Sequence, residues 1–195
     1  NTTGTDPYTF TLQGEGVSGA SPTMEVTGNG ETISNGDTNP DAADDTDFGT
    51  AVENTDTVDH VFTIRNIGTA ALDLTGTPQR VSVSGAGATH FSVTDQPGTP
   101  ISDGSQTNFT VRFAPTAAGV YTATVSIANN DDANDPYTFD IAGTAYSSVR
   151  TWDGGGGDNN ASTAGNWSDD ILPTASMDIL LDGTSTKDLT WDYDG

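Results

Sequence analysis

The chain has 195 residues, with 5 Lys or Arg against 28 Asp or Glu, so its formal net charge is −23. Nucleic acids and anionic membrane surfaces recruit basic proteins, so this charge argues against both as partners. The sequence has no cysteine, which excludes disulfides, thiolate metal sites and Cys nucleophiles. No apolar run approaches the ~20 residues of a membrane helix, so membrane insertion is not expected.

The first predicted element is a strand near the N-terminus that repeats a later strand. The sequence DPYTF occurs at residues 6–10 and again at 135–139, a spacing of about one Ig-like domain. We therefore expect residues 1–19 to be the last strand of a preceding repeat, or a strand donated to another copy of the chain. The apolar face of this assembly strand would consist of Tyr8, Phe10 and Leu12.

Between the two copies, apolar and polar residues alternate with period 2, which predicts strands with one buried face. Such strands are predicted at residues 23–27, 58–66, 71–75, 80–84, 91–94, 108–113, 120–127 and 137–142. Residues 20–145 are therefore predicted to form one Ig-like antiparallel β-sandwich. Its core is expected to include Phe62, Ile64, Phe109, Val111, Phe113, Val125 and Ile127.

After residue 146, glycine and tryptophan replace the alternating pattern. Four glycines at 154–157 lack the following Lys and the strand–helix context of a phosphate loop, so we expect a hinge or a tight turn there. Residues 146–195 are predicted to begin a further β-module. The predicted fold class is all-β: an Ig-like antiparallel β-sandwich flanked by partial β-modules.

Residues 24–144 resemble the choice-of-anchor D family of Ig-like repeats, which are relatives of the hydin-type (ASH) domains. The resemblance implies tandem modules in large secreted or cell-surface bacterial proteins, with structural or adhesive roles and no catalytic residues. The segments that carry it are VTGNG at 26–30, TDFG at 46–49, FTIRN at 62–66, FTVRFAP at 109–115 and PYTF at 136–139.

The tail resembles the Trp/Gly-rich repeats of autotransporter-like β-solenoids. The positions that carry this second resemblance are Trp152, Gly154, Gly155, Asn166, Trp167 and Pro173.

The sequence contains no recognisable catalytic motif. His60 is in phase with Phe62 and Ile64, as a partly buried strand residue would be, and His90 precedes a predicted strand. There is no nucleophile-elbow, zinc-protease or phosphate-loop pattern. An enzymatic role would require a parallel β-helix lyase that continues beyond residue 195, and nothing in this sequence supplies its active site, so the chain is expected not to be an enzyme.

Two acidic loops are candidates for binding Ca²⁺, which takes six to eight oxygen ligands and would relieve the repulsion between carboxylates. The spacing is not that of an EF-hand, so a solvated loop without metal is the alternative. The candidate ligands are Asp37, Asp41, Asp44, Asp45 and Asp47 in the first loop, and Asp131, Asp132 and Asp135 in the second.

These patterns favour a structural or adhesive module of an extracellular bacterial protein, such as a stalk, adhesin segment or fibre subunit. It would assemble through β-strand pairing with neighbouring repeats or copies of itself. The alternative is a carbohydrate- or ligand-binding module of a secreted protein, in which Trp152, Trp167 and Trp191 stack on glycans. Exposure of the three tryptophans on one face would favour the alternative.

Overall fold

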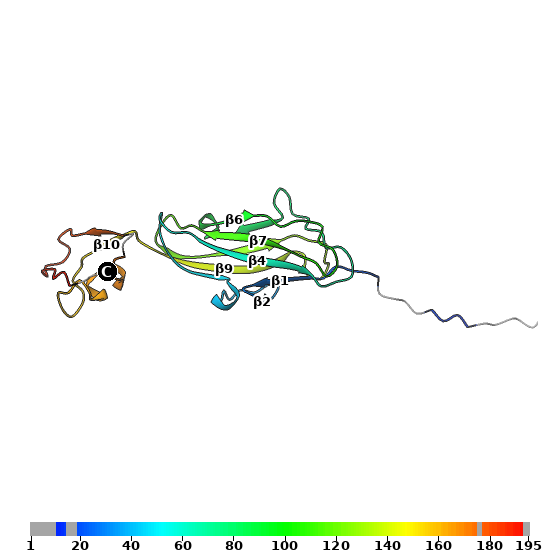
Figure 1. The fold of residues 1–195 in the computed structure, drawn as a ribbon, viewed down its shortest axis with the longest axis horizontal. Coiled ribbons are helices and arrows are strands. Elements are labelled where there is room, and N and C mark those ends of the chain that lie inside the picture. The colour runs from blue at the N-terminus through cyan, green and yellow to red at the C-terminus, as the bar shows by residue number, and fades with distance from the viewer. Residues whose placement is uncertain (1–10, 15–18, 175–176, 193–195) are drawn as a thin grey trace, which may run out of the picture.

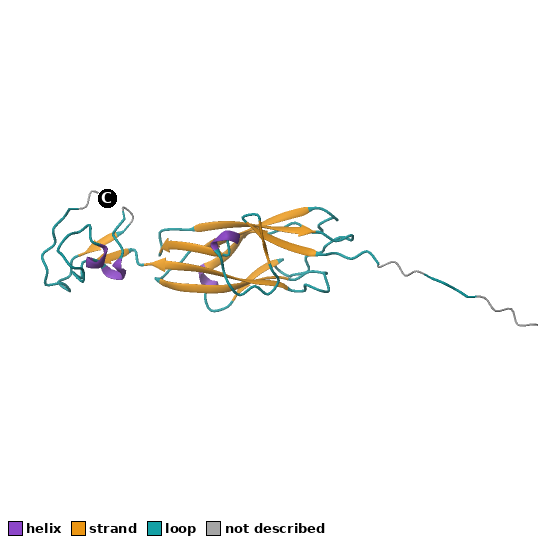
Figure 2. Cartoon of the chain, turned by 90° about the horizontal axis from the view of Figure 1, so that it is seen from below, coloured by secondary structure: helices purple, strands orange, loops and turns teal. Residues whose placement is uncertain are grey.

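The computed structural model describes residues 11–14, 19–174 and 177–192. These residues form an elongated two-sheet sandwich and a smaller C-terminal body (Figure 1). The chain joins the sandwich at one end, which we call the proximal end. It leaves for the C-terminal body at the opposite end, which we call the distal end (Figure 2). The all-β, Ig-like prediction is confirmed.

The sandwich consists of a five-stranded and a four-stranded sheet. The first sheet has the order β2-β1-β4-β7-β6, and the second has the order β3-β9-β8-β5. The strands of the first sheet are β1 (Met24–Gly28), β2 (Glu31–Ile33), β4 (Val58–Asn66), β6 (Phe91–Asp95) and β7 (Gln106–Phe113). The strands of the second are β3 (Asp47–Val52), β5 (Val81–Ser84), β8 (Gly119–Ile127) and β9 (Tyr137–Tyr146).

One strand pair departs from the predicted antiparallel arrangement. All neighbours in the first sheet are antiparallel, but β3 runs parallel to β9 along the edge of the second sheet. Its register shifts between Asp47 and Thr50, and Gly49 in this bulge has a φ of +66°. The bulge breaks the period-2 pattern, which explains why the sequence pattern did not reveal β3.

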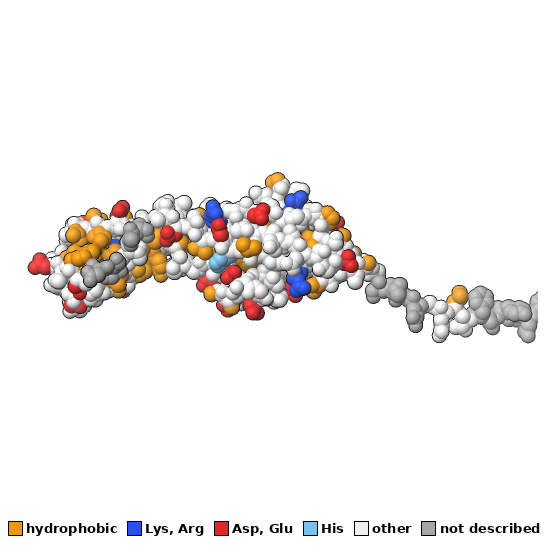
Figure 3. Space-filling view, in the orientation of Figure 1, with side chains coloured by type: hydrophobic (Ala, Val, Ile, Leu, Met, Phe, Trp, Pro, Cys, Tyr) orange, Lys and Arg blue, Asp and Glu red, His pale blue; other side chains and the backbone are white. Residues whose placement is uncertain are grey.

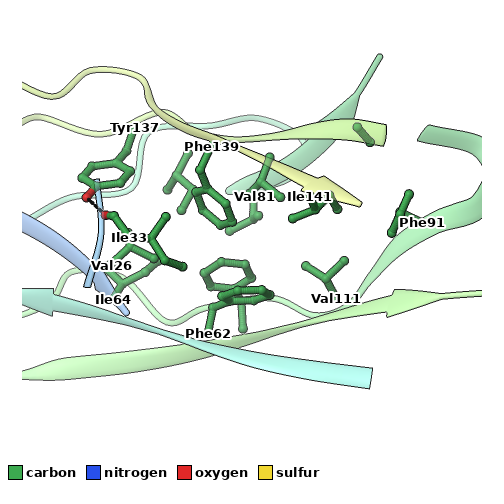
Figure 4. Close-up of a cluster of buried hydrophobic side chains, with 14 of the residues drawn as sticks. Val26, Ile33, Phe62, Ile64, Val81, Phe91, Val111, Tyr137, Phe139 and Ile141 are labelled. Carbon is green, nitrogen blue, oxygen red and sulfur yellow. Dashed lines mark hydrogen bonds between the residues drawn. The ribbon is translucent and has the colours of Figure 1, made fainter. Parts of the chain in front are cut away.

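The core lies between the sheets, as predicted. All seven residues of the expected core are fully buried. Aromatic rings from both sheets meet in its centre, where Phe62 lies 5.3 Å from Phe109 and 5.5 Å from Phe139, measured between ring centroids. Figure 4 shows Phe62 of the first sheet facing Phe139 of the second. The phase assigned to these strands is therefore correct.

The strand predicted at residues 71–75 is wrong. This segment makes two isolated bridges, from Leu72 to Ile101 and from Leu74 to Asn129. Both leucines are buried, so the apolar alternation reports burial correctly. Because its hydrogen bonds go to two different partners, the segment forms no regular ladder.

The described helices are four short 3-10 turns. They are η1 (Ala42–Asp44), η2 (Ala88–His90), η3 (Ala164–Asn166) and η4 (Ser168–Asp170). In the part of the chain that the structure describes, no helix is long and apolar enough to cross a membrane.

The C-terminal body has its own small core. Its two strands, β10 (Val149–Thr151) and β11 (Asp178–Leu180), are parallel. Trp152 and Trp167 are buried and pack edge to face, with ring centroids 5.3 Å apart. Their indole N–H groups donate to backbone carbonyls at 3.2 and 2.8 Å. Glycan stacking is therefore wrong for these two residues, whereas the Trp191 side chain is 57% exposed.

Three of the four glycines, Gly154 to Gly156, are closely packed, as expected for a tight turn, whereas a Cβ on Gly157 would meet no atom within 4 Å. Gly154 has a φ of +65°, which L side chains rarely adopt. A Cβ on Gly156 would lie 2.8 Å from Oδ1 of Asn166, and this oxygen accepts the Gly156 N–H at 2.9 Å. The glycines let the backbone approach the buried Asn166 closely.

Candidate assembly surfaces at the two ends of the sandwich

Both histidines have packing roles in the sandwich. His60 stacks on Phe48 with ring centroids 4.3 Å apart, and its Nδ1 donates to the Asp45 carbonyl at 2.7 Å. His90 stacks on Tyr121 at 3.7 Å, and its Nδ1 accepts the Thr116 N–H at 3.3 Å. Each ring is held between an aromatic neighbour and the backbone, as the strand phase of His60 indicated.

Four of the five candidate carboxylates in the 37–47 loop act as separate turn-forming acceptors, and the fifth candidate, Asp45, is half-buried with a φ of +62°. Those of Asp37, Asp41 and Asp47 each accept the N–H two residues ahead at 2.8 to 2.9 Å. Asp44 accepts both the N–H of Thr46, at 3.1 Å, and its hydroxyl, at 2.6 Å. Within the described residues, no three acidic or histidine side chains come together in a way that could hold a metal ion. The geometry therefore gives no support to the calcium prediction.

The 37–47 loop interrupts a stretch of chain that pairs with β9, through Asp37 before the loop and β3 after it. Its two ends are held by β9, because Gly36 N–H donates to the Thr138 carbonyl and the Ala142 N–H donates to the Thr46 carbonyl. Between these anchors, Asp44 is buried and its carbonyl lies so close to Gly28 that a Cβ there would be 1.9 Å away. The loop thus connects an edge of the second sheet to β1 of the first.

At the proximal end, a buried polar cluster ties β1 to the loop before β9. Oδ2 of Asp131 accepts the Met24 N–H at 2.9 Å and the Asn134 side chain at 2.8 Å, while Oδ1 accepts the Ala133 N–H at 3.1 Å. Burial opposes ionisation of Asp131, but these hydrogen bonds outweigh it and hold the pKa of the carboxyl below its usual value. Asp131 is thus a structural anchor.

The rest of this loop is built around Asn129. Its side chain donates to the carbonyls of Ile127 and Asn134 and accepts the Asp131 N–H at 2.8 Å. Its own N–H donates to Asp135 at 2.9 Å. The remaining candidate ligand, Asp132, is exposed and lines a pocket of about 300 Å³.

A second buried amide, Asn66, joins the same end and escaped the sequence analysis. Its Oδ1 accepts the N–H groups of Thr23 and Gly68, at 3.3 and 3.1 Å. Its Nδ2 donates to the carbonyls of Ala70 and Ile101, at 2.7 and 3.0 Å. The sequence does contain a signal for this residue. Asn66 continues the alternation of Phe62 and Ile64, so a polar side chain occupies a position where the pattern predicts burial. We call Asn66, Asn129 and Asp131 the proximal clamp.

The N-terminal assembly strand is only partly described. Tyr8 and Phe10 lie outside the described residues, and Leu12 is 84% exposed. The later copy of the sequence forms β9, where the corresponding side chains of Tyr137, Phe139 and Ile141 are all buried. Tyr137 also donates its hydroxyl to the Ile33 carbonyl at 2.5 Å, and burial raises the pKa of this phenol.

At the distal end, Arg150 packs into the junction between the sandwich and the C-terminal body. Its side chain is fully buried, its Nη1 donates to Asp169 at 2.9 Å, and its guanidinium carbon lies 5.7 Å from the centroid of the Tyr146 ring. Nε and Nη2 of this residue have no hydrogen-bond partner in the described structure. Arg150 in β10 thus connects the last residue of β9, Tyr146, to Asp169 of the C-terminal body.

A family model described as a protein of unknown function (DUF1573) matches residues 42–145, more than half of the chain. The chain belongs to the DUF1573 family. The DUF1573 region begins at η1 and ends within β9, so it contains strands β3 to β8, most of β9 and the 129–135 loop, but not β1 and β2. The two-sheet sandwich agrees with the coarse expectation of an Ig-like domain family. No curated protein matches the chain.

Several solved structures match this DUF1573 protein at low identity. A protein of unknown function from Porphyromonas gingivalis is 17% identical with a TM-score of 0.45; the match covers 63% of this chain and 46% of that one. The chain thus spans less than half of that protein's length. The ASH/PapD-like domain 7 of human CEP192 is 12% identical with a TM-score of 0.42, covering 71% and 95%. A CARDB domain from Pyrococcus furiosus is 13% identical with a TM-score of 0.36, covering 65% and 96%.

Proposed function

We propose that the chain is a non-catalytic structural module that spaces and holds neighbouring domains in a secreted or cell-surface bacterial protein. The observation that carries this proposal is the position of the two chain connections at opposite ends of the sandwich (Figure 1). A module joined at opposite ends transmits tension along its long axis. The proposal includes membership of the choice-of-anchor D repeats, with neighbouring repeats or copies of the chain as partners. This part of the proposal is supported by the sequence resemblance.

The strand order suits a module under tension. Tension from the proximal side pulls on β1, which is paired along its length with β4. Tension from the distal side pulls on β9, which is held between β3 and β8. Both loads run along the strands, so the hydrogen bonds of a ladder must break together. The proximal clamp adds a buried contact at the point where the load enters β1.

The side-chain chemistry also supports a structural role. Four of the five carboxylates in the 37–47 loop cap turns, and both histidines pack against aromatic rings. The rival glycan-binding role has less support, because Trp152 and Trp167 form the core of the C-terminal body.

Single-molecule pulling of the full chain tests the proposal. The chain lacks cysteine, so attachment points can be placed freely. One geometry pulls through the two termini. The other pulls through Thr50→Cys and Ser82→Cys, on the two edge strands β3 and β5 of one sheet. We expect a higher unfolding force through the termini, because the cross-sheet geometry breaks hydrogen bonds one after another. Equal forces, or a lower force through the termini, would contradict the proposal.

A further inference from the structure

The C-terminal body is a coil that stacks on itself with a spacing of 29 to 30 residues. The parallel pair of β10 and β11 joins residues 29 apart in sequence, from Val149 with Asp178 to Thr151 with Leu180. Farther along, an isolated parallel bridge joins Asn160 to Thr190, 30 residues apart. Two parallel contacts with almost the same spacing mean that residues 178–192 retrace the path of residues 149–161 in a second layer.

The turn after each strand repeats at the same spacing. Gly154 follows the first strand and Gly183 the second, and their φ values are +65° and +81°. The aspartate before each glycine caps its own turn: Asp153 accepts the Gly155 N–H, and Asp182 accepts the Thr184 N–H, both at 2.9 Å. Each of the two layers therefore contains its own copy of a strand followed by an Asp–Gly turn.

The second layer has an open, apolar edge. Asp178 N–H donates to Ser148, and the Leu180 carbonyl accepts the Trp152 N–H, so these groups face β10. In a parallel ladder the backbone groups of the residue between them, Ile179, face the opposite edge. No described strand pairs with that edge. The large apolar side chains exposed on this layer are Ile179, Leu180, Leu181 and Trp191; Figure 3 shows hydrophobic side chains gathered on the C-terminal body.

We propose that the open edge of β11 is a docking surface for one further polypeptide coil, which adds a parallel strand in the register that joins β10 to β11. The continuity of the ladder identifies this occupant, because the spacing and the Asp–Gly turn already recur once. An unpaired strand edge offers backbone donors and acceptors to such a strand. The exposed leucines and Ile179 would be covered by it. This inference goes beyond the spacer role, since the sandwich could transmit tension with or without it.

Disulfide trapping on the full chain tests the proposal. The probe is a peptide with the sequence of residues 177–186, which carries one strand–Asp–Gly unit, with cysteine in place of its leucine at position 180. The chain carries Leu180→Cys, or the control Val120→Cys, an apolar residue 74% exposed on β8. Neighbouring strands bring matched Cα atoms within disulfide range. We expect the peptide to cross-link preferentially to the Leu180→Cys chain. A peptide with its cysteine moved by one residue should cross-link less, because its side chain points to the other face.

A second variant asks whether backbone pairing is responsible. Ile179→Pro, combined with Leu180→Cys, removes the N–H on the open edge and leaves the groups that face β10. We expect the yield of cross-linked product to fall about fivefold, because losing one typical backbone hydrogen bond weakens peptide binding by about that factor. Unchanged fluorescence of the buried Trp152 and Trp167 would show that the body remains folded. If the fluorescence changes, Ile179→Lys replaces this variant, because lysine blocks strand addition at an edge.

Two results would overturn the proposal. One is equal cross-linking of the peptide to Leu180→Cys and Val120→Cys, with no effect of Ile179→Pro. The other is a predominance of chain–chain disulfides, since this would show that a second copy, and not a further coil, occupies the edge.

Discussion

Asp131 accepts the backbone N–H of Met24 at 2.9 Å, across 107 positions of the sequence. This bond fastens the first residue of β1 to the loop that leads into β9. The two strands to which the chain connections are joined therefore meet at the proximal end of the sandwich. Removing the bond is the simplest way to ask how much the proximal clamp contributes to the fold.

Asp131→Asn is expected to lower the free energy of unfolding by about 1–3 kcal/mol, because an amide NH₂ would face N–H donors that now bind a carboxylate. Urea denaturation of the full chain measures this loss. The matched control is Asp132→Asn on the neighbouring exposed residue, which should stay within about 0.5 kcal/mol of the wild type. Equal effects of the two variants would mean that the clamp contributes nothing specific.

The same carboxyl predicts a pH dependence. Its pKa is below the ordinary value of 3.8 in the folded chain, so folding favours the ionised form. The stabilisation that the Asp131 carboxylate gives to the folded state is fully present above the ordinary pKa. It is lost as the pH falls through the lower pKa of the folded chain. The difference in unfolding free energy between wild type and Asp131→Asn should therefore be constant near neutral pH and shrink in acid. A difference that does not change with pH would contradict this assignment.

Gly28→Ala tests the contact between β1 and the acidic loop. A Cβ at this position would lie 1.9 Å from the Asp44 carbonyl, so the loop or the strand must shift. We expect a loss of about 3 kcal/mol, at the upper end for overpacked sites. Gly98→Ala is the control, because its Cβ would make only an ordinary contact, 3.7 Å from the Thr107 hydroxyl oxygen. A tolerated Gly28→Ala would show that the loop is not held against β1.

Calcium binding by the 37–47 loop stays a prediction, and a melting temperature that is the same in Ca²⁺ and in chelator would contradict it. A ligand that binds only the native state raises stability by about 2.7 kcal/mol at a hundredfold excess over its Kd, which thermal denaturation detects easily. The carboxylates of Asp37, Asp41, Asp44 and Asp47 already accept hydrogen bonds within their own turns. A higher melting temperature in Ca²⁺ than in chelator would show that these side chains rearrange to bind the ion.

The alternating strands could be predicted because one face of each is buried. Phe62, Ile64 and Phe109 therefore signalled both strand and core. The parallel strand β3 could not be predicted in this way, because the bulge at Gly49 interrupts the alternation of apolar and polar residues. The hypothesis of glycan stacking failed at Trp152 and Trp167 because a body with few apolar residues uses its largest side chains as core.

The proximal clamp and the stacked coil were harder to infer. The acidic composition of the 131–135 loop resembles that of a metal site, and only the folded chain shows that Asp131 faces backbone donors from β1. The two layers of the coil share little more than the Asp–Gly pairs ending at Gly154 and Gly183. Their 29-residue spacing is visible in the register of β10 and β11 and not in the sequence.

The most direct test of the structural role is the unfolding force of Asp131→Asn pulled through the two termini. It is compared with Val83→Ala, which removes part of a partly buried side chain on the edge strand β5. Unfolding under force reports the barrier along the pulling direction, so variants of similar chemical stability can differ in force. We predict a clear drop for Asp131→Asn and a smaller one for Val83→Ala. A drop that follows chemical stability alone, with no excess for Asp131→Asn, would contradict the account of the sandwich as a module built to hold tension.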